Sequence, residues 1–209
     1  MQKRILIHGS GHKAASWKET ISYLNHREDI LCPELANLLN GREASYSNLR
    51  TAFAEYCTHA GESIHLCGLS LGGILALDHA LEHPEQVETL VLIGTPHKVP
   101  KAAFALQNVV FRFLPKSMFT SMAFDKKDTF ALGNTMKDLD FSGRLGEIQC
   151  PTLILCGEKD SANLKSAHFL TQHIQGANLQ VLEGIGHVVN EEAPKVLARQ
   201  LNEFYGHYN

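Results

Sequence analysis

The chain has 209 residues, with 19 lysines and arginines against 22 aspartates and glutamates, so its formal net charge is −3. This balance provides no basic surface for nucleic acid or an anionic membrane, and we expect neither as a partner. Hydrophobic residues make up 44% of the chain and charged residues 20%. These proportions exclude a disordered or collagen-like protein and favour one globular domain over residues 1–209.

The five cysteines form no C-x-x-C pair, so we expect neither a disulfide framework nor a catalytic thiol. The apolar run that follows the basic N-terminal residues is too short for a secretory signal. No apolar stretch approaches the length of about 20 residues that a membrane span needs. The sequence therefore predicts a cytoplasmic protein.

Short apolar runs alternate with helical patterns along the whole chain. Leu90-Val91-Leu92-Ile93 and Leu153-Ile154-Leu155 are apolar throughout, which is typical of strands covered on both faces. Strands separated by helices favour a parallel sheet. The sequence thus predicts a mostly parallel six-stranded sheet with helices on both faces. The predicted strands are residues 4–8, 29–33, 63–68, 88–93, 152–156 and 178–182.

One interval, residues 97–144, lies between two predicted strands and is too long for a single crossover helix. Its mixture of apolar and charged residues predicts two or three short helices, which would form a lid inserted within the domain. The lid's aromatic and methionine side chains either line an apolar acyl pocket or attach the lid to the body. The candidates for the pocket are Phe104, Phe111, Phe113, Met118, Met122 and Phe124.

A glycine-rich segment, Gly68 to Gly73, joins a predicted strand to a predicted helix and satisfies the pattern G-x-S-x-G around Ser70. Small residues two positions before and after the serine permit a very tight turn, which holds the hydroxyl above the sheet. The helix N-terminus points backbone N–H groups toward the same space. A serine hydroxyl needs a base before it is a good nucleophile. Taken alone, the segment also fits an ordinary turn before a helix.

Two further polar residues follow the last two predicted strands. His187 ends the segment Gly184-Ile185-Gly186-His187, and Asp160 follows the preceding strand. The carboxyl ends of parallel strands share one edge of the sheet, so we expect both residues to lie near Ser70. The chain order is then nucleophile, acid, base. Alternatively, His187 is a surface histidine and Asp160 a helix N-cap, and Asp138 and Asp140 are weaker candidates for the acid.

With His8-Gly9-Ser10-Gly11 and His83-Pro84-Glu85 added to these motifs, the sequence resembles the α/β-hydrolase superfamily. The matching stretches span nearly the whole chain outside the predicted lid and are most similar to the small serine esterases. The resemblance implies the α/β-hydrolase fold without its two N-terminal antiparallel strands.

The resemblance also assigns roles to particular residues. It implies Ser70 as the nucleophile, His187 as the general base and Asp160 as the carboxylate that orients His187. It places the oxyanion hole at the backbone N–H groups of Leu71 and Ser10. The activity it implies is hydrolysis of a small or medium carboxylic ester, or a related acyl bond, through an acyl-enzyme on Ser70. The partner is then a small-molecule acyl substrate, and we expect no cofactor.

A dinucleotide-binding oxidoreductase is one alternative, because residues 9–14 also fit the pattern G-x-G-x-x-A after a strand. That pattern requires an acidic residue about 20 positions further on. The available carboxylates are Glu28, Asp29 and Glu34. A hydrolase loop needs the same glycines, which explains them without a cofactor.

A metal site is a second alternative, because His79 and His83 are four residues apart on one predicted helix. The zincin pattern places glutamate after the first histidine, but position 80 is alanine. We therefore interpret both residues as surface histidines and expect no metal. A ligand-binding protein without turnover, or a lyase that cleaves carbon–carbon bonds, remains open within the same fold.

Overall fold

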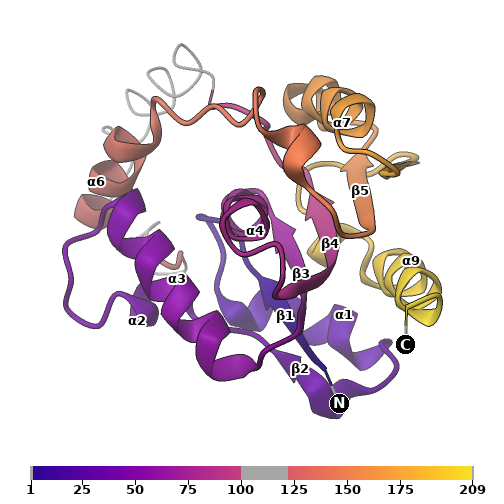
Figure 1. The fold of residues 1–209 in the computed structure, drawn as a ribbon, viewed down its shortest axis with the longest axis horizontal. Coiled ribbons are helices and arrows are strands. Elements are labelled where there is room, and N and C mark those ends of the chain that lie inside the picture. Colours follow the sequence, from indigo (N-terminus) through magenta and orange to yellow (C-terminus); the bar gives the residue numbers. More distant parts are fainter. Residues whose placement is uncertain (1, 100–121, 209) are drawn as a thin grey trace.

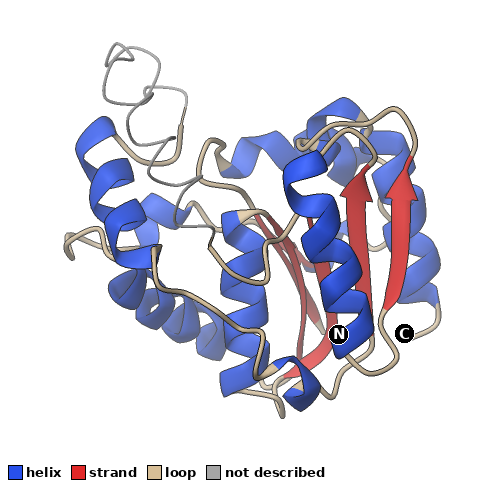
Figure 2. Ribbon diagram, turned by 90° about the horizontal axis from the view of Figure 1, so that it is seen from above, coloured by secondary structure: helices blue, strands red, loops and turns tan. Residues whose placement is uncertain are grey.

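The computed structural model describes residues 2–99 and 122–208. Six strands form one sheet in the order β2-β1-β3-β4-β5-β6, and every neighbouring pair is parallel. Helices cover both faces of the sheet (Figures 1 and 2). The predicted fold class is confirmed. The strands are β1 (Lys3–Ile7), β2 (Ile30–Leu31), β3 (Ile64–Leu69), β4 (Val87–Ile93), β5 (Thr152–Gly157) and β6 (Asn178–Leu182).

The second strand is the one that differs most from its predicted range. Residues 29–33 were expected to be extended, but β2 contains only Ile30 and Leu31. Asp29 instead ends the short 3-10 helix η2 (Arg27–Asp29) and forms a 3.1 Å ion pair with Lys3 of β1. The strand therefore begins one residue later than predicted, and it ends before Pro33 because proline cannot donate to a ladder.

The sheet separates two hydrophobic clusters. Ile5 and Ile7 of β1 belong to one cluster and Leu6 to the other, because successive side chains of a strand point to opposite faces. Every residue of β3 and of β5 is buried. This double burial explains why their sequences are apolar at consecutive positions.

The helices divide between the two clusters. On one face α3 (Tyr46–Ala60), α4 (Leu71–Glu82), α6 (Lys126–Met136) and α7 (Ser161–His173) bury their apolar side chains. On the other face lie η1 (Ala14–Trp17), α8 (Val189–Glu192) and α9 (Pro194–Gly206). The remaining short elements are α1 (Lys18–Ser22), α2 (Leu35–Leu38) and η4 (Leu145–Glu147).

The predicted lid, residues 97–144, is described only at its two ends. Its later part contains α6, which lies beside α3 (Figure 1). The two ends pair with each other, since the Val99 N–H donates to Leu139 O and the Phe141 N–H to His97 O, both at 2.9 Å. Four of the proposed pocket residues lie outside the described residues: Phe104, Phe111, Phe113 and Met118. The lid itself stays a prediction.

The two described pocket candidates differ in their surroundings. Phe124 is 2% exposed and belongs to the same hydrophobic cluster as Leu132 and Met136 of α6. Met122 is partly exposed. The burial of Phe124 therefore favours attachment of the segment to the body over lining of an acyl pocket.

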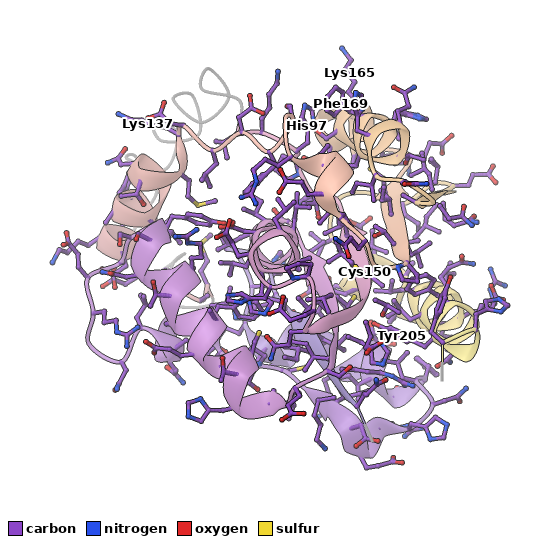
Figure 3. All side chains as sticks on the ribbon, viewed as in Figure 1. His97, Lys137, Cys150, Lys165, Phe169 and Tyr205 are labelled. Carbon is purple, nitrogen blue, oxygen red and sulfur yellow. The ribbon has the colours of Figure 1, made fainter. Side chains whose placement is uncertain are left out.

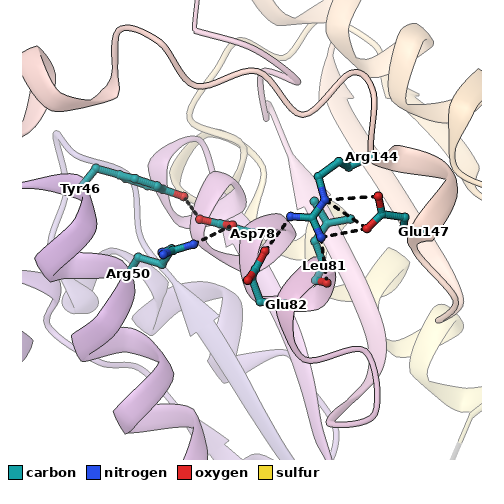
Figure 4. A network of polar contacts seen from close by, with 7 residues as sticks. All are labelled: Tyr46, Arg50, Asp78, Leu81, Glu82, Arg144 and Glu147. Atoms are coloured by element: carbon teal, nitrogen blue, oxygen red, sulfur yellow. Dashed lines mark hydrogen bonds and ion pairs between the residues drawn. The ribbon is translucent and has the colours of Figure 1, made fainter.

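Both ends of this segment are anchored on the sheet's helices. At its start, the ring of His97 stacks on Phe169 of α7 with centroids 4.2 Å apart, and its Nδ1 lies 2.9 Å from Ser166 Oγ (Figure 3). At its end, Arg144 donates to Glu82 at the end of α4 at 2.6 Å (Figure 4). The segment is thus tied to α7 and to α4.

The network in Figure 4 continues along α4 toward α3. The Tyr46 hydroxyl of α3 donates to Asp78 of α4 at 2.7 Å, and Arg50 lies 3.9 Å from the same carboxylate. Burial raises the pKa of Asp78, and the two partners oppose that rise. The buried carboxylate is therefore compensated by groups from the neighbouring helix.

The cysteines are free thiols, as the sequence predicted: Cys32, Cys57, Cys67, Cys150 and Cys156. Burial raises the pKa of Cys150 to about 11, so this thiol is protonated at neutral pH.

Within residues 2–99 and 122–208, no helix is long and apolar enough to cross a membrane.

The start of α4 packs against the end of β1 at backbone distance. A Cβ atom added to Gly72 would lie 2.2 Å from the carbonyl oxygen of Ile7 and 2.8 Å from that of His8. Both oxygens belong to the backbone, one to the last residue of β1 and the other to the residue after it, so neither can move aside. Only glycine fits at this position.

We predict that Gly72→Ala lowers the free energy of unfolding by about 3 kcal/mol, because the added methyl group forces α4 away from β1. Urea denaturation followed by circular dichroism measures the change. Gly143→Ala is the matched control, since a Cβ there meets no atom within 4 Å, and we expect it to stay within about 0.5 kcal/mol of wild type. Equal stability of the two variants would contradict the packing described for α4.

Candidate active site

Ser70 lies in the turn between β3 and α4, at the carboxyl edge of the sheet. Its backbone has φ 53° and ψ −112°, a left-handed conformation that is uncommon for residues other than glycine. The turn is tight enough that a Cβ atom on Gly68 would lie 2.2 Å from Gly72 O. The Ser70 N–H donates to Ile93 O at the end of β4, at 2.9 Å. The predicted strand–turn–helix setting of G-x-S-x-G is present.

Asp160 and His187 meet at the same edge. Asp160 follows β5, and its Oδ2 lies 2.6 Å from His187 Nδ1. Gly94 follows β4 with φ 51°, and a Cβ atom there would lie 2.9 Å from His187 Nδ1. The Asp160–His187 pair therefore packs on the backbone at the end of β4, next to Ile93, which accepts the Ser70 N–H.

The carboxylate of Asp160 is buried, with its side chain 5% exposed, and is held by two neighbours. Asn163 Nδ2 lies 3.0 Å from each carboxylate oxygen. Burial alone would raise the pKa of Asp160, but the hydrogen bonds from His187 and Asn163 outweigh burial and place it below its ordinary value. Asp160 is therefore ionised at neutral pH, which fixes the ring hydrogen of His187 on Nδ1 and leaves Nε2 as the proton acceptor.

The loop that carries His187 is attached to the β5–α7 turn. The Gly184 N–H donates to Glu158 Oε2 at 2.9 Å, and the Lys159 N–H donates to Ile185 O at 2.9 Å. The two segments are thus joined by one bond to a side chain and one bond between backbones. These bonds hold His187 beside the turn that supplies its carboxylate partner.

The loop after β1 lies against Ser70 from the other side. A Cβ atom added to Gly9 would lie 3.5 Å from Ser70 Cβ. His8 donates from Nδ1 to Gly9 O at 2.9 Å and accepts the Leu35 N–H at Nε2, at 3.1 Å. Burial lowers the pKa of His8, in agreement with this neutral tautomer. Ser10 follows in this loop and Leu71 opens α4, so both predicted oxyanion donors belong to segments that adjoin Ser70.

The carboxylates offered for a dinucleotide site serve other contacts. Glu34 Oε2 accepts the Ala14 N–H at 3.1 Å. Asp29 is paired with Lys3. Glu34 therefore holds the loop of residues 9–14 in place, which is a structural use of the residue.

The weaker candidates for the acid lie elsewhere. Asp140 Oδ1 accepts the Ser142 N–H at 2.9 Å, and the backbones of Asp140 and Lys98 form an isolated antiparallel β-bridge at the paired ends of the predicted lid. Asp138 precedes it on the same segment. Asp160 contacts His187.

The interpretation of His79 as a surface histidine is wrong. Its ring is 4% exposed, packs edge-on against Phe53 of α3 and lies 2.9 Å from Gln86 Oε1 through Nε2. Burial lowers its pKa to about 4. His83 is partly exposed, with its side chain 43% accessible. Among the described residues, no group of three histidine, cysteine, aspartate or glutamate side chains is placed to hold a metal ion.

Two residues at the site were missed by the sequence reasoning. Asn163 lies three positions after Asp160, the spacing of an N-cap and its partner, and this spacing was a usable signal. Gly94 follows β4 directly, so a glycine at the same strand end as the other site residues was a second signal. Both act through contacts with the Asp160–His187 pair.

The chain belongs to the alpha/beta hydrolase family, whose model matches residues 5–200. It is 27% identical to a 2-hydroxy-6-oxononadienedioate/2-hydroxy-6-oxononatrienedioate hydrolase of Klebsiella pneumoniae, over 88% of this chain and 80% of that protein. It is 34% identical to a pimeloyl-[acyl-carrier protein] methyl ester esterase of Aromatoleum aromaticum, over 44% of this chain and 36% of that protein. The protein is therefore a hydrolase.

Solved structures agree on the fold. The structure of an esterase from Exiguobacterium antarcticum superposes with a TM-score of 0.81 and 17% identity, covering 99% of this chain and 92% of that chain. At this level of identity the likeness shows the fold alone.

We predict that Asp160→Asn destabilises the protein by about 1–3 kcal/mol at neutral pH, since it removes the charge from buried hydrogen bonds. The pKa of Asp160 in the folded protein lies below 3.8, so its stabilising contribution is complete above about pH 4 and is lost as the pH falls through the folded value. Urea unfolding at pH 7 and at pH 3 should show the larger difference between wild type and variant at pH 7. A difference that grows toward acid would contradict this sign.

Proposed function

We propose that the protein is a serine hydrolase that cleaves a small or medium carboxylic ester, or a related acyl bond, through an acyl-enzyme on Ser70. The observation that carries this proposal is the 2.6 Å contact between His187 Nδ1 and Asp160 Oδ2 at the sheet edge where Ser70 begins α4. The substrate is a small molecule that the protein meets in the cytoplasm, without a nucleic acid or membrane partner.

The mechanism follows the division of labour in a serine, histidine and aspartate triad. His187 Nε2 takes the proton of the Ser70 hydroxyl while Ser70 Oγ attacks the carbonyl carbon. Asp160 stabilises the imidazolium that results. His187 then returns the proton to the leaving alcohol, and the acyl group stays on Ser70. Water, activated by the same imidazole, releases the acid and restores the hydroxyl.

The negative charge of the tetrahedral intermediate needs donors that are already in place. In the proposal, the backbone N–H groups of Leu71 and Ser10 bind this oxygen. The N-terminus of α4 adds the positive end of its dipole at the same point. The left-handed conformation of Ser70 supports this geometry, because it turns the backbone sharply between β3 and α4.

We propose cleavage of a 2-hydroxy-6-oxo-dienedioate as the second candidate function. It is supported by the relative of that name from Klebsiella pneumoniae, which aligns with 88% of this chain. The same serine, base and carboxylate would serve either reaction. The two candidates differ in the bond that breaks, so they are separated by substrate.

We predict that Ser70→Ala lowers kcat by at least about 10³-fold for any true substrate, because the attacking oxygen is gone. Ser47→Ala, an exposed serine of α3, is the control and should keep full activity. Mass spectrometry after treatment with a fluorophosphonate should find one adduct on Ser70 in the wild type. Activity of Ser70→Ala within tenfold of wild type would refute the mechanism.

We further predict that p-nitrophenyl esters of increasing acyl length give a burst of product followed by steady turnover, with a length optimum that reports the size of the acyl site. 2-Hydroxy-6-oxononadienedioate should be assayed in parallel, and the substrate with the higher kcat/KM decides between the two candidates. Absence of a burst and of turnover with every compound would favour a ligand-binding protein without catalysis.

A further inference from the structure

Glu192 in α8 accepts hydrogen bonds from the backbone on both sides of His187. Its Oε2 lies 2.7 Å from the Gly186 nitrogen, and its Oε1 lies 3.1 Å from the Val188 nitrogen. The two oxygens of one carboxylate therefore bind the amide before His187 and the amide after it. Each donor has its own acceptor atom.

The space for this carboxylate is created by Gly186. A Cβ atom at position 186 would lie 2.8 Å from Glu192 Oε1 and 2.9 Å from Oε2. The backbone nitrogen of Glu192 also donates to Val188 O at 2.9 Å. Glu192 and the His187 loop are thus joined by bonds in both directions.

This arrangement differs from ordinary helix capping. One bond returns from the last residue of α8 to its N-cap residue, Val188, as in a capping box, but the other reaches Gly186, two residues before the cap. Charge-assisted hydrogen bonds are shorter and stronger than neutral ones, and two of them from one side chain restrict rotation of the bound segment. Here the restricted segment is the backbone of Gly186 and Val188, on either side of His187.

We propose that Glu192 is a positioning residue, which fixes the backbone around His187 so that Nδ1 stays directed to Asp160 and Nε2 stays available to Ser70. The role rests on the proposed function of His187 as the base. Glu192 does not contact the reacting atoms and acts through the loop alone. Its removal therefore reduces the rate of the chemical step and leaves substrate binding unchanged.

Two variants at position 192 test the proposal. Glu192→Gln keeps one acceptor oxygen but turns an NH₂ group toward the second donor, while Glu192→Ala removes both acceptors. We expect kcat to fall about tenfold for the first and about 100-fold for the second, the size of loss that small misplacement of a catalytic group produces. KM and the melting temperature should stay close to wild type.

The neighbouring residue provides a matched control. Glu191 is exposed, lies on the same turn and carries the same charge, but the two amides beside His187 are bound by Glu192. Glu191→Gln and Glu191→Ala should keep kcat within twofold of wild type. If both Glu192 variants are stable and keep kcat within twofold, or if only their KM changes, the proposal is overturned.

A second measurement does not depend on turnover. Hydrogen exchange should be at least tenfold faster than in wild type at both the Gly186 and the Val188 amide in Glu192→Ala, at least tenfold faster at one of the two amides in Glu192→Gln, and unchanged in Glu191→Gln. If Ser70→Ala proves active, the proposed function fails, but this exchange still shows whether Glu192 holds the loop. Unchanged exchange at both amides overturns the proposal independently of activity. Should Glu192→Ala fail to fold, Glu192→Gln decides the outcome.

Discussion

A close backbone contact between the start of α4 and the end of β1 determines where the candidate site lies. Gly72 allows α4 to begin against the carbonyl groups that end β1, and Gly68 allows the preceding turn to close onto α4. With no room for a Cβ atom at either position, the residue between them takes the left-handed conformation observed for Ser70. The strained turn is therefore a consequence of packing, and its cost is met by the buried contacts of α4.

Carboxylates that accept backbone N–H groups help to hold the loops around Ser70. Loops lack the regular backbone pairing of helices and strands, so their amides need other acceptors. An acidic side chain satisfies an amide and also fixes the loop's direction. The pairs are Glu34 with Ala14, Asp160 with Asn163, Glu158 with Gly184, and Glu192 with Gly186 and Val188.

The parts of the structure that follow from local sequence were predictable. Apolar runs located all six strands, and a glycine-rich segment located the turn at Ser70. The burial of His79 and the two hydrogen bonds that Glu192 accepts from the His187 loop were not predictable in this way. The first depends on Phe53 of a separate helix, and the second on backbone donors that sequence does not display. Neither of these two contacts leaves a periodic pattern in the sequence.

Asp160 shows why two interpretations of one residue need not exclude each other. It is the N-cap of α7, accepting from the Asn163 N–H at 3.4 Å through Oδ1, and it contacts His187 at 2.6 Å through Oδ2. A helix that starts directly after a parallel strand places its cap at the carboxyl edge, where the candidate site lies. The cap holds one oxygen and thereby directs the other to the imidazole. The start of α7 thus supplies both stability and orientation, and the same carboxylate cannot be altered for one purpose without affecting the other.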